Sequence, residues 1–377
     1  MQRILHVVNI MDRGGVETLL MNIYRQIDRD KMQFDFLTHP YHRDAIQEYE
    51  NEIKDMGGIV YKAPRFVKNP IQYRRYVCQV LDSHRYQIVH GHSLETSSVV
   101  YMREVKKRKL YLIAHAHNTG ETGSVARRCA VGMAHRAIRQ YPDFFFGCSD
   151  EAINIDFGFR NAQSDRSKLF HNGIDLSRYN IDEYEHQLQK ADIYGTADSA
   201  FPVFGTVGRL TEQKNQLFLL DVFAEIMKRE PISILSIVGK GGLENALRSK
   251  ASDLGIASHV RFEGSVPNVP SYLKAFDVFL FPSIYEGLGM AGVEAQAAGL
   301  PTLMSTNVPS LAHCTDLAQS LPLSAGPNVW ADKAIEMYRA NVGQRKDRTD
   351  SVREAGFDIS QIAQGLCDFY EAHGGTR

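Results

Sequence analysis

Residues 278–304 read VFLFPSIYEGLGMAGVEAQAAGLPTLM and contain a complete strand–helix–strand unit. The runs Val278–Phe281 and Pro301–Met304 have the length and apolar composition of buried strands, and Ala291–Ala298 is expected to be the helix between them. Strands joined through a helix in this way run parallel in one sheet, because a crossover connection is needed to return the chain to the same edge. The segment therefore predicts an α/β fold with a parallel sheet.

The same alternation extends in both directions. In the second half of the chain we expect strands at Val203–Val207, Ser233–Val238 and Val260–Glu263, and helices at Gln216–Lys228, Leu243–Leu254 and Pro270–Phe276. In the first half we expect strands at Arg3–Ile10, Phe34–Thr38, Ile59–Tyr61, Ile88–His90, Leu110–His115 and Phe144–Cys148, with helices between most of them. Each half therefore predicts a doubly wound, Rossmann-like parallel sheet, and two such domains facing each other would enclose an interdomain cleft.

A polar segment without a clear strand separates the two halves, between Ser177 and Pro202. We place the domain junction there. The expected organisation is a first domain over residues 1–180, a linker over 181–201, a second domain over 202–357 and a terminal segment over 358–377. The terminal segment has helical periodicity from Ile359 to Ala372.

Composition excludes several classes of protein. The chain has 377 residues, of which 44% are hydrophobic and 23% charged, and this rules out a disordered or fibrous protein. Its 43 basic side chains are balanced by 44 acidic ones, so binding of nucleic acid is not expected. No apolar run approaches the roughly 18 residues that cross a bilayer, and the five scattered cysteines predict neither disulfides nor a structural zinc site. We therefore expect a cytoplasmic protein.

Phosphate chemistry has sequence signatures, and the two commonest ones are absent. The chain contains no Gly-x-x-x-x-Gly-Lys-Ser/Thr, and no Gly-x-Gly-x-x-Gly follows the first strand. The first strand instead leads into Gly14-Gly15-Val16-Glu17, where two glycines allow backbone amides to approach a ligand. A tight turn with no ligand explains this pair equally well.

Two glutamates frame the start of the helix in residues 278–304. Glu286 precedes Gly287-Leu288-Gly289-Met290, and Glu294 lies eight positions after Glu286. Free amides at the helix start suit a diphosphate, while Glu294 is placed to accept from ribose hydroxyls and Glu286 from sugar hydroxyls. For either residue alone, the simpler interpretation is an acid that favours the helix dipole or a solvent-facing helical glutamate.

Arg209 and Lys214 follow the expected strand Val203–Val207. Arginine offers a planar fork of donors and lysine a mobile point charge, a combination suited to a departing pyrophosphate. Two exposed loop cations are the commoner fate of such residues, but their place after a strand, together with the two glutamates, favours a function. Because fixed cations and helix-end amides can stabilise the leaving charge, and because no Asp-x-Asp follows an apolar strand, we expect neither a metal nor a cofactor.

Taken together, these motifs resemble those of the retaining, GT-B-fold glycosyltransferases of family four, over nearly the whole chain. Glu286 and Glu294 match the family's Glu-x7-Glu pattern, and Arg209 with Lys214 matches its Arg/Lys pair. Further matches are Gly14-Gly15, Asn172-Gly173-Ile174-Asp175 and Ala298-Gly299-Leu300-Pro301, and Gly287-Leu288-Gly289 stands where the family often has Gly-Phe-Gly. The narrower resemblance is to bacterial exopolysaccharide and capsule glycosyltransferases.

The resemblance implies transfer of a hexosyl or N-acetylhexosaminyl group from a nucleotide diphosphate sugar, with UDP as the expected nucleotide. The acceptor would be a glycan or a polyprenyl-diphosphate-linked sugar in extracellular or capsular polysaccharide synthesis. The first domain would bind the acceptor, the second would bind the donor, and residues 358–377 would return to the first domain as a helix. The implied catalytic residues are Arg209, Lys214, Glu286 and His117, and the implied donor-binding residues are Gly14, Gly15, Gly287, Leu288, Gly289, Met290 and Glu294.

The family is thought to react by front-face attack, in which the leaving phosphate accepts the acceptor's proton. Retaining glycosidases use two carboxylates across the bond instead, and Glu286 is not expected to act as such a nucleophile.

Histidines end two expected strands in the first half, as His90-Gly-His92 and His115-Ala-His117-Asn118. A His-x-His pair can supply two metal ligands, but spacing fixes no cysteine or acidic partner nearby, so a metal is not expected. The resemblance places His117 beside the donor sugar. His90, His92 and Asn118 are weaker candidates for orienting the acceptor, and capping of the strands is an alternative for the first two.

A local basic excess predicts contact with an anionic membrane surface on the inner face. Residues 101–140 contain only two acids, Glu104 and Glu121, against nine basic residues: Arg103, Lys106, Lys107, Arg108, Lys109, Arg127, Arg128, Arg136 and Arg139. Apolar residues interleave with the cations at Val125, Cys129, Met133 and Ile138. A solvated helix face explains the same pattern equally well.

Two other functions compete with glycosyl transfer. A sugar phosphorylase or nucleotide-sugar epimerase would keep phosphate-binding loops, but neither is expected to show both the Glu-x7-Glu pattern and the Arg/Lys pair. A non-catalytic, glycosyltransferase-like binding subunit would be favoured by loss of Arg209, Lys214 or Glu286, and all three are present.

Overall fold

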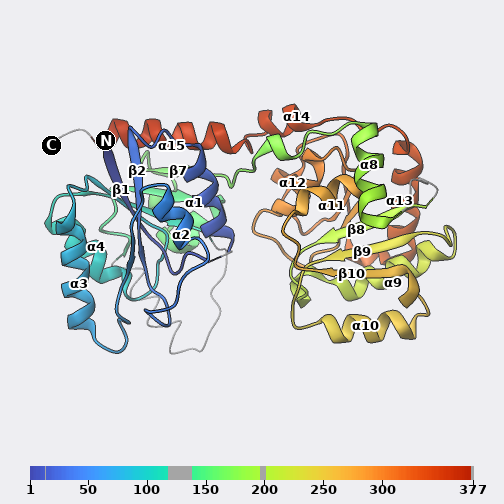
Figure 1. The fold of residues 1–377 in the computed structure, drawn as a ribbon, viewed down its shortest axis with the longest axis horizontal. Helices are drawn as coiled ribbons and strands as arrows, with labels where there is room; N and C mark the ends of the chain where they lie inside the picture. The colour runs from blue at the N-terminus through green and yellow to red at the C-terminus, as the bar shows by residue number, and fades with distance from the viewer. Residues whose placement is uncertain (13, 118–137, 196–200, 375–377) are drawn as a thin grey trace. The chain divides into compact units, whose positions relative to one another are not determined.

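The computed structural model describes residues 1–12, 14–117, 138–195 and 201–374. The chain forms two compact units (Figure 1). Unit 1 comprises Met1–Ile174 and Ile359–Arg377, and unit 2 comprises Asp175–Asp358. Each unit is built on its own parallel sheet, with seven strands in unit 1 and six in unit 2.

Unit 1 has the strand order β3-β2-β1-β4-β5-β6-β7. Its strands are β1 (Gln2–Val7), β2 (Met32–Thr38), β3 (Val60–Lys62), β4 (Ile88–Gly91), β5 (Tyr111–Ala116), β6 (Phe144–Gly147) and β7 (Ser167–Leu169). Its helices are α1 (Gly15–Gln26), α2 (Glu50–Asp55), α3 (Pro70–Ser83), α4 (Ser98–Lys107), α6 (Asp150–Phe157), α7 (Phe159–Ala162) and α15 (Ile359–His373).

Alternation of side chains along the strands builds two cores in unit 1, one on each face of the sheet. On β1, Leu5 and Val7 belong to the core shared with α3, α4 and α6, whereas Ile4 belongs to the core shared with α1 and α15. His6 has the parity of Ile4, and therefore points to the face that α1 and α15 cover. The parity of neighbouring strands places His90 and His115 on that face too.

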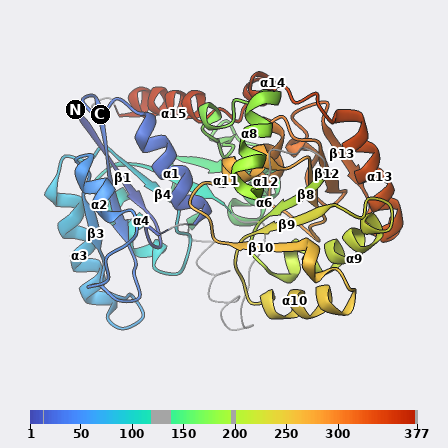
Figure 2. The same cartoon turned by 45° about the vertical axis from the view of Figure 1, so that its right-hand side comes forward.

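Helix α15 comes from the end of the chain but packs among elements from its beginning, beside α1 in both views (Figures 1 and 2). Its buried residues Ile359, Ala363, Leu366 and Tyr370 recur at helical spacing and form one apolar face. The backbone amide of Ile359 also donates to the carbonyl oxygen of Ile174 at 3.0 Å. The chain therefore leaves unit 1 and returns to it at one place.

Unit 2 has the strand order β10-β9-β8-β11-β12-β13. Its strands are β8 (Val203–Val207), β9 (Ile234–Val238), β10 (Val260–Gly264), β11 (Val278–Phe281), β12 (Thr302–Ser305) and β13 (Ala318–Leu321). Its helices are α8 (Glu183–Tyr194), α9 (Gln216–Met227), α10 (Glu244–Asp253), α11 (Val269–Ala275), α12 (Met290–Ala297), α13 (Gly326–Asn341) and α14 (Thr349–Glu354). Trp330, the only tryptophan of the chain, is fully buried in the core formed with α9.

The segment expected to be a linker, residues 181–201, differs from that expectation because it contains α8, which is part of unit 2. Lys190 Nζ on α8 lies 2.8 Å from Asp277 Oδ2, and His186 Nε2 lies 3.1 Å from Asp277 Oδ1. Asp277 also accepts from the Val203 amide at the start of β8. Polar contacts hold α8 in place, so the apolar pattern of the sequence did not reveal it.

The predicted class, two parallel α/β sheets, is confirmed. Helix α2 is short: its periodic apolar pattern begins at Ile46, but the helix itself runs only from Glu50 to Asp55. Several elements had not been expected: α6, α7, β7, β13, α13 and α14. Most are short or partly exposed, so their apolar periodicity is weak.

Candidate functional site

The central strands of unit 2 define where a ligand can bind. The order β10-β9-β8-β11-β12-β13 places β8 beside β11, although β9 and β10 lie between them in the sequence. The strand order therefore reverses between β8 and β11, and crevices at such points bind ligands in open α/β sheets. Arg209 and Lys214 follow β8, and Glu286 to Met290 follow β11, so both predicted groups lie at this point.

Lys214 and Glu286 form an ion pair across this point, with Nζ and Oε1 2.6 Å apart. The side chains are only 17% and 7% exposed, and the lysine ammonium also lies 5.0 Å from the centroid of the Phe281 ring. Few water molecules can therefore screen the two charges. An entering phosphate group would compete with Glu286 for Lys214, and would leave the carboxylate available to sugar hydroxyls.

Hydrogen bonds to backbone carbonyls tie the loops after β8 and β11 together. The Ile284 amide donates to the Gln213 carbonyl at 2.8 Å, and Gln213 Nε2 donates to the Tyr285 carbonyl at 3.1 Å. Asn307, after β12, donates from Nδ2 to the Ile284 carbonyl at 2.8 Å. The loops that follow β8, β11 and β12 are thus linked by hydrogen bonds, and these bonds fix the backbone on both sides of the Lys214–Glu286 ion pair.

The glycines at the start of α12 leave room for a ligand. A Cβ atom on Gly287 would meet no atom within 4 Å, so the backbone there is open to close approach. Gly289 is the N-cap of α12 with φ of 84°, a left-handed conformation that favours glycine. Met290 begins the helix, and Leu288 is buried and anchors the loop. The amides at the start of α12 can therefore be reached by an anion.

Arg209 is exposed and, among the residues that the structure describes, has no ion-pair partner. Its backbone carbonyl accepts from Gln216 Nε2 at 2.9 Å, which fixes the loop while leaving the guanidinium free. The predicted pair thus consists of one cation held by Glu286 and one that is free to meet phosphate.

Glu294 lies on α12 beside Tyr179, which hydrogen bonds to it, and near the charge of Arg178. Loss of hydration raises the pKa of Glu294 to about 7, although Arg178 and Tyr179 both act to lower it. Burial therefore disfavours the ionised form of the Glu294 carboxyl group. A ribose edge that donates two hydroxyl hydrogen bonds would favour its ionised form.

Gly14 and Gly15 lie in unit 1, where Gly14 is the N-cap of α1 and Gly15 its first residue. A side chain on Gly14 would collide with the carboxylate of Glu17, whereas Gly15 faces open space. Burial, together with the charge of Asp12, raises the pKa of Glu17. The predicted site residues therefore fall into two groups, one in each unit.

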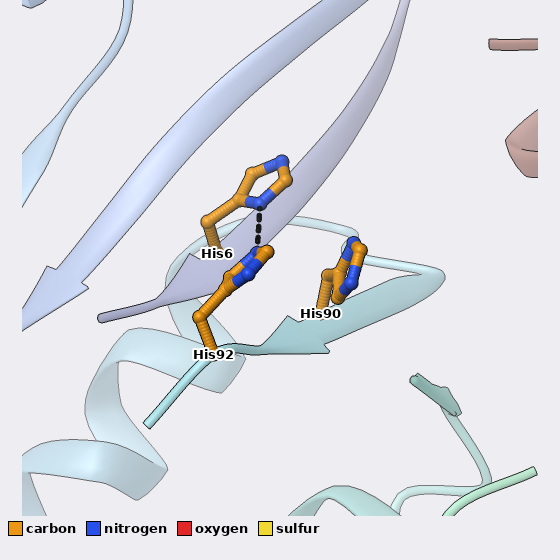
Figure 3. Close-up of side chains that lie close together, drawn as sticks. All are labelled: His6, His90 and His92. Carbon is orange, nitrogen blue, oxygen red and sulfur yellow. Dashed lines mark hydrogen bonds between the residues drawn. The ribbon is translucent and has the colours of Figure 1, made fainter. Parts of the chain in front are cut away.

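The switch point of unit 1, between β1 and β4, is occupied by histidines (Figure 3). His6 Nδ1 lies 3.1 Å from His92 Nε2, and His92 Nδ1 lies 2.8 Å from His117 Nε2, so three rings form a hydrogen-bonded chain. His90 is fully buried, and its Nδ1 lies 2.6 Å from the Tyr370 hydroxyl on α15. His90 thus anchors α15, and a role toward an acceptor would be indirect.

Burial keeps the histidine cluster neutral, that is His6, His90, His92, His115 and His117. It lowers the pKa of His6 and His117 to about 3 and depresses those of His90, His92 and His115 well below the usual range. His115 is 1% exposed, and neither of its ring nitrogens has a hydrogen-bond partner among the described residues. The cluster can therefore donate and accept hydrogen bonds across the neutral pH range, without a change of charge.

Imidazole nitrogens also bind transition metals. Ring nitrogens of His6, His90 and His92 lie within 4.8 Å of one another, as do those of His92, His115 and His117. Neither triplet includes a cysteine or a carboxylate. These are the groups that could hold a metal, and the expectation of metal-independent catalysis stays a prediction.

Parts of two predicted features lie outside the described residues. These include Asn118 and the cations Arg127, Arg128 and Arg136. In the described part of the basic segment, acids from other elements form ion pairs with some of the cations. The net positive charge at this surface is therefore smaller than expected. Lys106 binds Asp143 at 2.7 Å, and Arg108 binds Asp82 at 2.7 Å. Ile138, one of the apolar residues that interleave with the cations, is buried in the core of unit 1 and is not available to a membrane. In the described residues no helix combines the length and apolar character required to span a bilayer.

Sequence reasoning missed several residues of this arrangement. His6 lies inside an expected strand, and the only available signal was one polar side chain in an apolar run. Tyr179 and Arg178 meet Glu294 only through the fold. Gln213 directly precedes Lys214, but its contacts with the loop after β11 depend on β8 lying beside β11.

Two family models match the chain. Glycosyltransferase Family 4 matches residues 13–178, and Glycosyl transferases group 1 matches residues 201–339. The putative glycosyltransferase EpsF of Bacillus subtilis (strain 168) is 31% identical over 374 residues, which cover 98% of this chain and 96% of that protein. The capsular polysaccharide biosynthesis glycosyltransferase CapH of Staphylococcus aureus is 24% identical over 380 residues, which cover 98% and 99% of the two chains.

A UDP-Gal:alpha-D-GlcNAc-diphosphoundecaprenol alpha-1,3-galactosyltransferase of Escherichia coli is 29% identical over 241 residues, which cover 56% of this chain and 62% of that protein. Among solved structures, Anabaena Alr3699/HepE in complex with UDP has a TM-score of 0.78 at 17% identity, and the match covers 99% of this chain and 100% of that chain. The similarity to the HepE structure shows a shared fold. With both units matched by family models and EpsF aligned over almost its full length, the chain belongs to the family-4 glycosyltransferases and has their GT-B fold.

Proposed function

We propose that this glycosyltransferase moves a hexosyl or N-acetylhexosaminyl group from a UDP-sugar to a glycan or polyprenyl-diphosphate-linked acceptor, with retention of anomeric configuration. The pathway would be capsular or extracellular polysaccharide synthesis. The observation that carries the proposal is the Lys214–Glu286 ion pair, at 2.6 Å, which joins two strand ends at the switch point of unit 2.

The leaving diphosphate accounts for the cations. As the bond to the sugar breaks, negative charge grows on the departing phosphate oxygen, and Arg209, Lys214 and the amides at the start of α12 stabilise it. Lys214 exchanges Glu286 for phosphate, and Glu286 then accepts from sugar hydroxyls. Because these groups supply positive charge without a metal ion, the proposed transfer is metal-independent.

Retention follows from attack on the same face that the diphosphate leaves, with the leaving phosphate taking the acceptor's proton. His117 is the proposed neighbour of the donor sugar. It is neutral, and its Nε2 is engaged by His92 Nδ1, which leaves the other ring nitrogen for the sugar. Glu294 takes the ribose.

The comparisons support the finer assignments without deciding them. The HepE structure contains UDP, and the E. coli relative is named for a UDP-sugar and a diphosphoundecaprenol acceptor. CapH is named for capsular polysaccharide biosynthesis. These names favour UDP as the nucleotide and a lipid-linked acceptor for this chain.

The test is release of nucleotide diphosphate from a panel of UDP-, GDP- and dTDP-sugars, with and without candidate acceptors, in the presence of a chelator. A thermal-shift screen with the free nucleotide diphosphates identifies the base first, because a ligand of the folded state raises its stability. We expect UDP to give the largest shift. Nuclear magnetic resonance of the product then gives the anomeric configuration.

The matched comparison uses variants of equal charge change. Arg209→Ala and Lys214→Ala should each cost about 2–4 kcal/mol of transition-state stabilisation. Arg248→Ala and Lys228→Ala remove exposed cations of the same unit that pair with neighbouring helical glutamates, and should leave turnover near normal. Near-normal turnover of the Arg209/Lys214 double variant would contradict the assignment.

Peripheral attachment to an anionic membrane through residues 101–140 stays part of the proposal. Its test is sedimentation with anionic vesicles at low and raised salt, because screening weakens binding of this kind. A protein that stays in the supernatant at low salt would remove the membrane contact and leave the transferase assignment intact.

A further inference from the structure

A cavity of about 280 Å³ opens on unit 1 where the loops after β2 and β3 meet the start of α3. Its lining includes three cations, Arg43, Arg65 and Lys68, and a single carboxylate, Asp44. None of its lining residues is among those proposed to bind the donor.

The two arginines of this cavity are held in position by contacts that do not neutralise them. Arg43 Nε donates to the Lys62 carbonyl at 2.9 Å, and its guanidinium lies 5.1 Å from the Tyr76 ring centroid. The Arg65 guanidinium lies 4.1 Å from the ring centroid of Tyr41. These contacts leave the terminal nitrogens of both guanidinium groups available to a ligand.

Glu50, a buried acid on α2 of the same unit, is already paired with other cations. Glu50 binds Lys62 at 2.6 Å and Lys54 at 2.8 Å, and burial is outweighed by these partners, so the pKa of Glu50 falls to about 2. In the described part of the chain, Arg43, Arg65 and Lys68 take part in no ion pair. The cavity therefore carries an uncompensated positive charge.

The turn after β3 gathers the charges. The amides of Lys68 and Asn69 both donate to the Arg65 carbonyl, at 3.1 and 3.2 Å, and this turn brings Arg65 and Lys68 to one side. Two guanidinium forks and one ammonium suit a polyvalent phosphate group better than a single carboxylate, because each fork can bind two oxygens.

Apolar side chains stand exposed beside the cations. Val67, between Arg65 and Lys68, is 83% exposed, and Ile71, in the first turn of α3, is 67% exposed. Large aliphatic side chains exposed in the same segment, residues 65–72, that supplies part of the cavity lining fit a ligand whose charged end continues into a hydrocarbon chain. A free phosphate or a soluble sugar phosphate would give them no contact.

We propose that this cavity binds the diphosphate of a polyprenyl-diphosphate-linked acceptor, with the first isoprene units lying on Val67 and Ile71. The inference rests on the proposed function and specifies its acceptor. The strand order also gives the approximate distance between this cavity and His117. From β2 to β5, which precedes His117, are three strand spacings, about 14 Å at about 4.8 Å each. The acceptor should therefore carry sugar residues between its diphosphate and the hydroxyl that reacts.

The test measures binding by the whole chain with the donor site filled by saturating nucleotide diphosphate. The probes are inorganic pyrophosphate, phosphatidylcholine vesicles containing undecaprenyl diphosphate, and phosphatidylcholine vesicles containing phosphatidylglycerol. The triple variant Arg43→Ala/Lys68→Ala/Arg65→Ala should weaken binding of the first two roughly tenfold to a hundredfold. The control variant Lys31→Ala/Arg85→Ala/Arg160→Ala removes the same charge from exposed positions of unit 1 and should bind both like the wild type.

A second variant tests the lipid. Val67→Ser/Ile71→Ser should weaken binding to undecaprenyl diphosphate vesicles while pyrophosphate binding is retained. Equal loss of both, or of neither, would overturn the lipid contact.

Other outcomes overturn the site as a whole. One is pyrophosphate binding that the triple variant keeps. The other is a loss of binding to phosphatidylglycerol vesicles in the triple variant as large as its loss to undecaprenyl diphosphate vesicles, which would indicate that the cavity adheres to any anionic membrane. A failure of the proposed function looks different, since the wild type would then release no nucleotide diphosphate from any sugar donor whatever these vesicles show.

Discussion

Replacing Glu294 with glutamine should stabilise unit 2 and weaken donor binding at the same time. The carboxylate of Glu294 loses hydration on α12, and its pKa rises to about 7 from an ordinary 4.5. An acid with a raised pKa favours folding only while it is protonated, so its ionisation destabilises the folded state as the pH rises from about 4.5 through 7. Glutamine has the same shape, keeps a hydrogen bond to Tyr179 and does not ionise.

The magnitude follows from these two pKa values. At 1.36 kcal/mol for each unit, the folded state of the wild type is penalised by about 1 kcal/mol at pH 5 and about 3 kcal/mol at pH 8. Glu294→Gln should remove that penalty, so its advantage in free energy of unfolding should grow by about 2 kcal/mol between the two pH values.

Tryptophan fluorescence suits this measurement, because Trp330 is the only tryptophan of the chain and is buried in unit 2. Urea unfolding of the wild type and Glu294→Gln at pH 5 and pH 8 gives the required differences. Glu354→Gln, at an exposed position of α14 in the same unit, is the control and should change stability by less than about 0.5 kcal/mol at either pH. An advantage of equal size at both pH values would refute the role of ionisation.

Activity should move in the opposite direction. The ionised carboxylate accepts two ribose hydrogen bonds and glutamine accepts fewer, so the donor KM should rise about tenfold. The donor KM of the wild type should fall as the pH rises through about 7, and this dependence should vanish in Glu294→Gln. A variant with unchanged KM would separate Glu294 from the donor.

Three further predictions concern the return of α15 to unit 1. Gly173→Ala would place a Cβ atom 2.9 Å from Ile359 Cα, so unit 1 should lose about 1–3 kcal/mol in urea unfolding followed by circular dichroism, whereas Gly365→Ala on α15 meets open space and should be neutral or stabilising. Tyr370→Phe removes the hydroxyl that His90 contacts at 2.6 Å and should cost about 1–3 kcal/mol, measured in the same way. Deleting the residues after Phe357 should expose an apolar face and abolish transfer, and a truncated protein with unchanged stability and turnover would show that the helix is dispensable.

Much of the fold was predictable from the sequence, because strands such as Val203–Val207 and Val278–Phe281 are short apolar runs whose character is local. The elements that were missed depend on partners far away. Helix α8 is held by Asp277, which lies 87 positions after Lys190, and the polar segment gave no apolar pattern to find. Strand β13 has only partly buried side chains, so its alternation is weak.

The candidate site was predictable to the level of loops but not of contacts. The sequence placed Arg209, Lys214 and Glu286 after strands, which fixes the edge of the sheet. That Lys214 reaches Glu286 requires β8 to lie beside β11, and strand order is a property of the whole chain. The hydrogen-bonded series His6–His92–His117 could not be predicted for the same reason, because its three rings meet only if β1, β4 and β5 are neighbours in the sheet.

Each unit has desolvated polar groups close to the point where its strand order reverses. In unit 2 these groups are Glu294, with its raised pKa, and the largely desolvated pair Lys214–Glu286. In unit 1 they include His115, whose buried ring nitrogens have no partner among the described residues. Polar groups that have lost hydration without gaining full hydrogen bonding lower the stability of the folded protein. Burial of the apolar cores on either side of each sheet offsets that cost. A ligand that supplies the missing hydrogen bonds and charges is therefore bound by groups that are already in place and have little hydration left to lose.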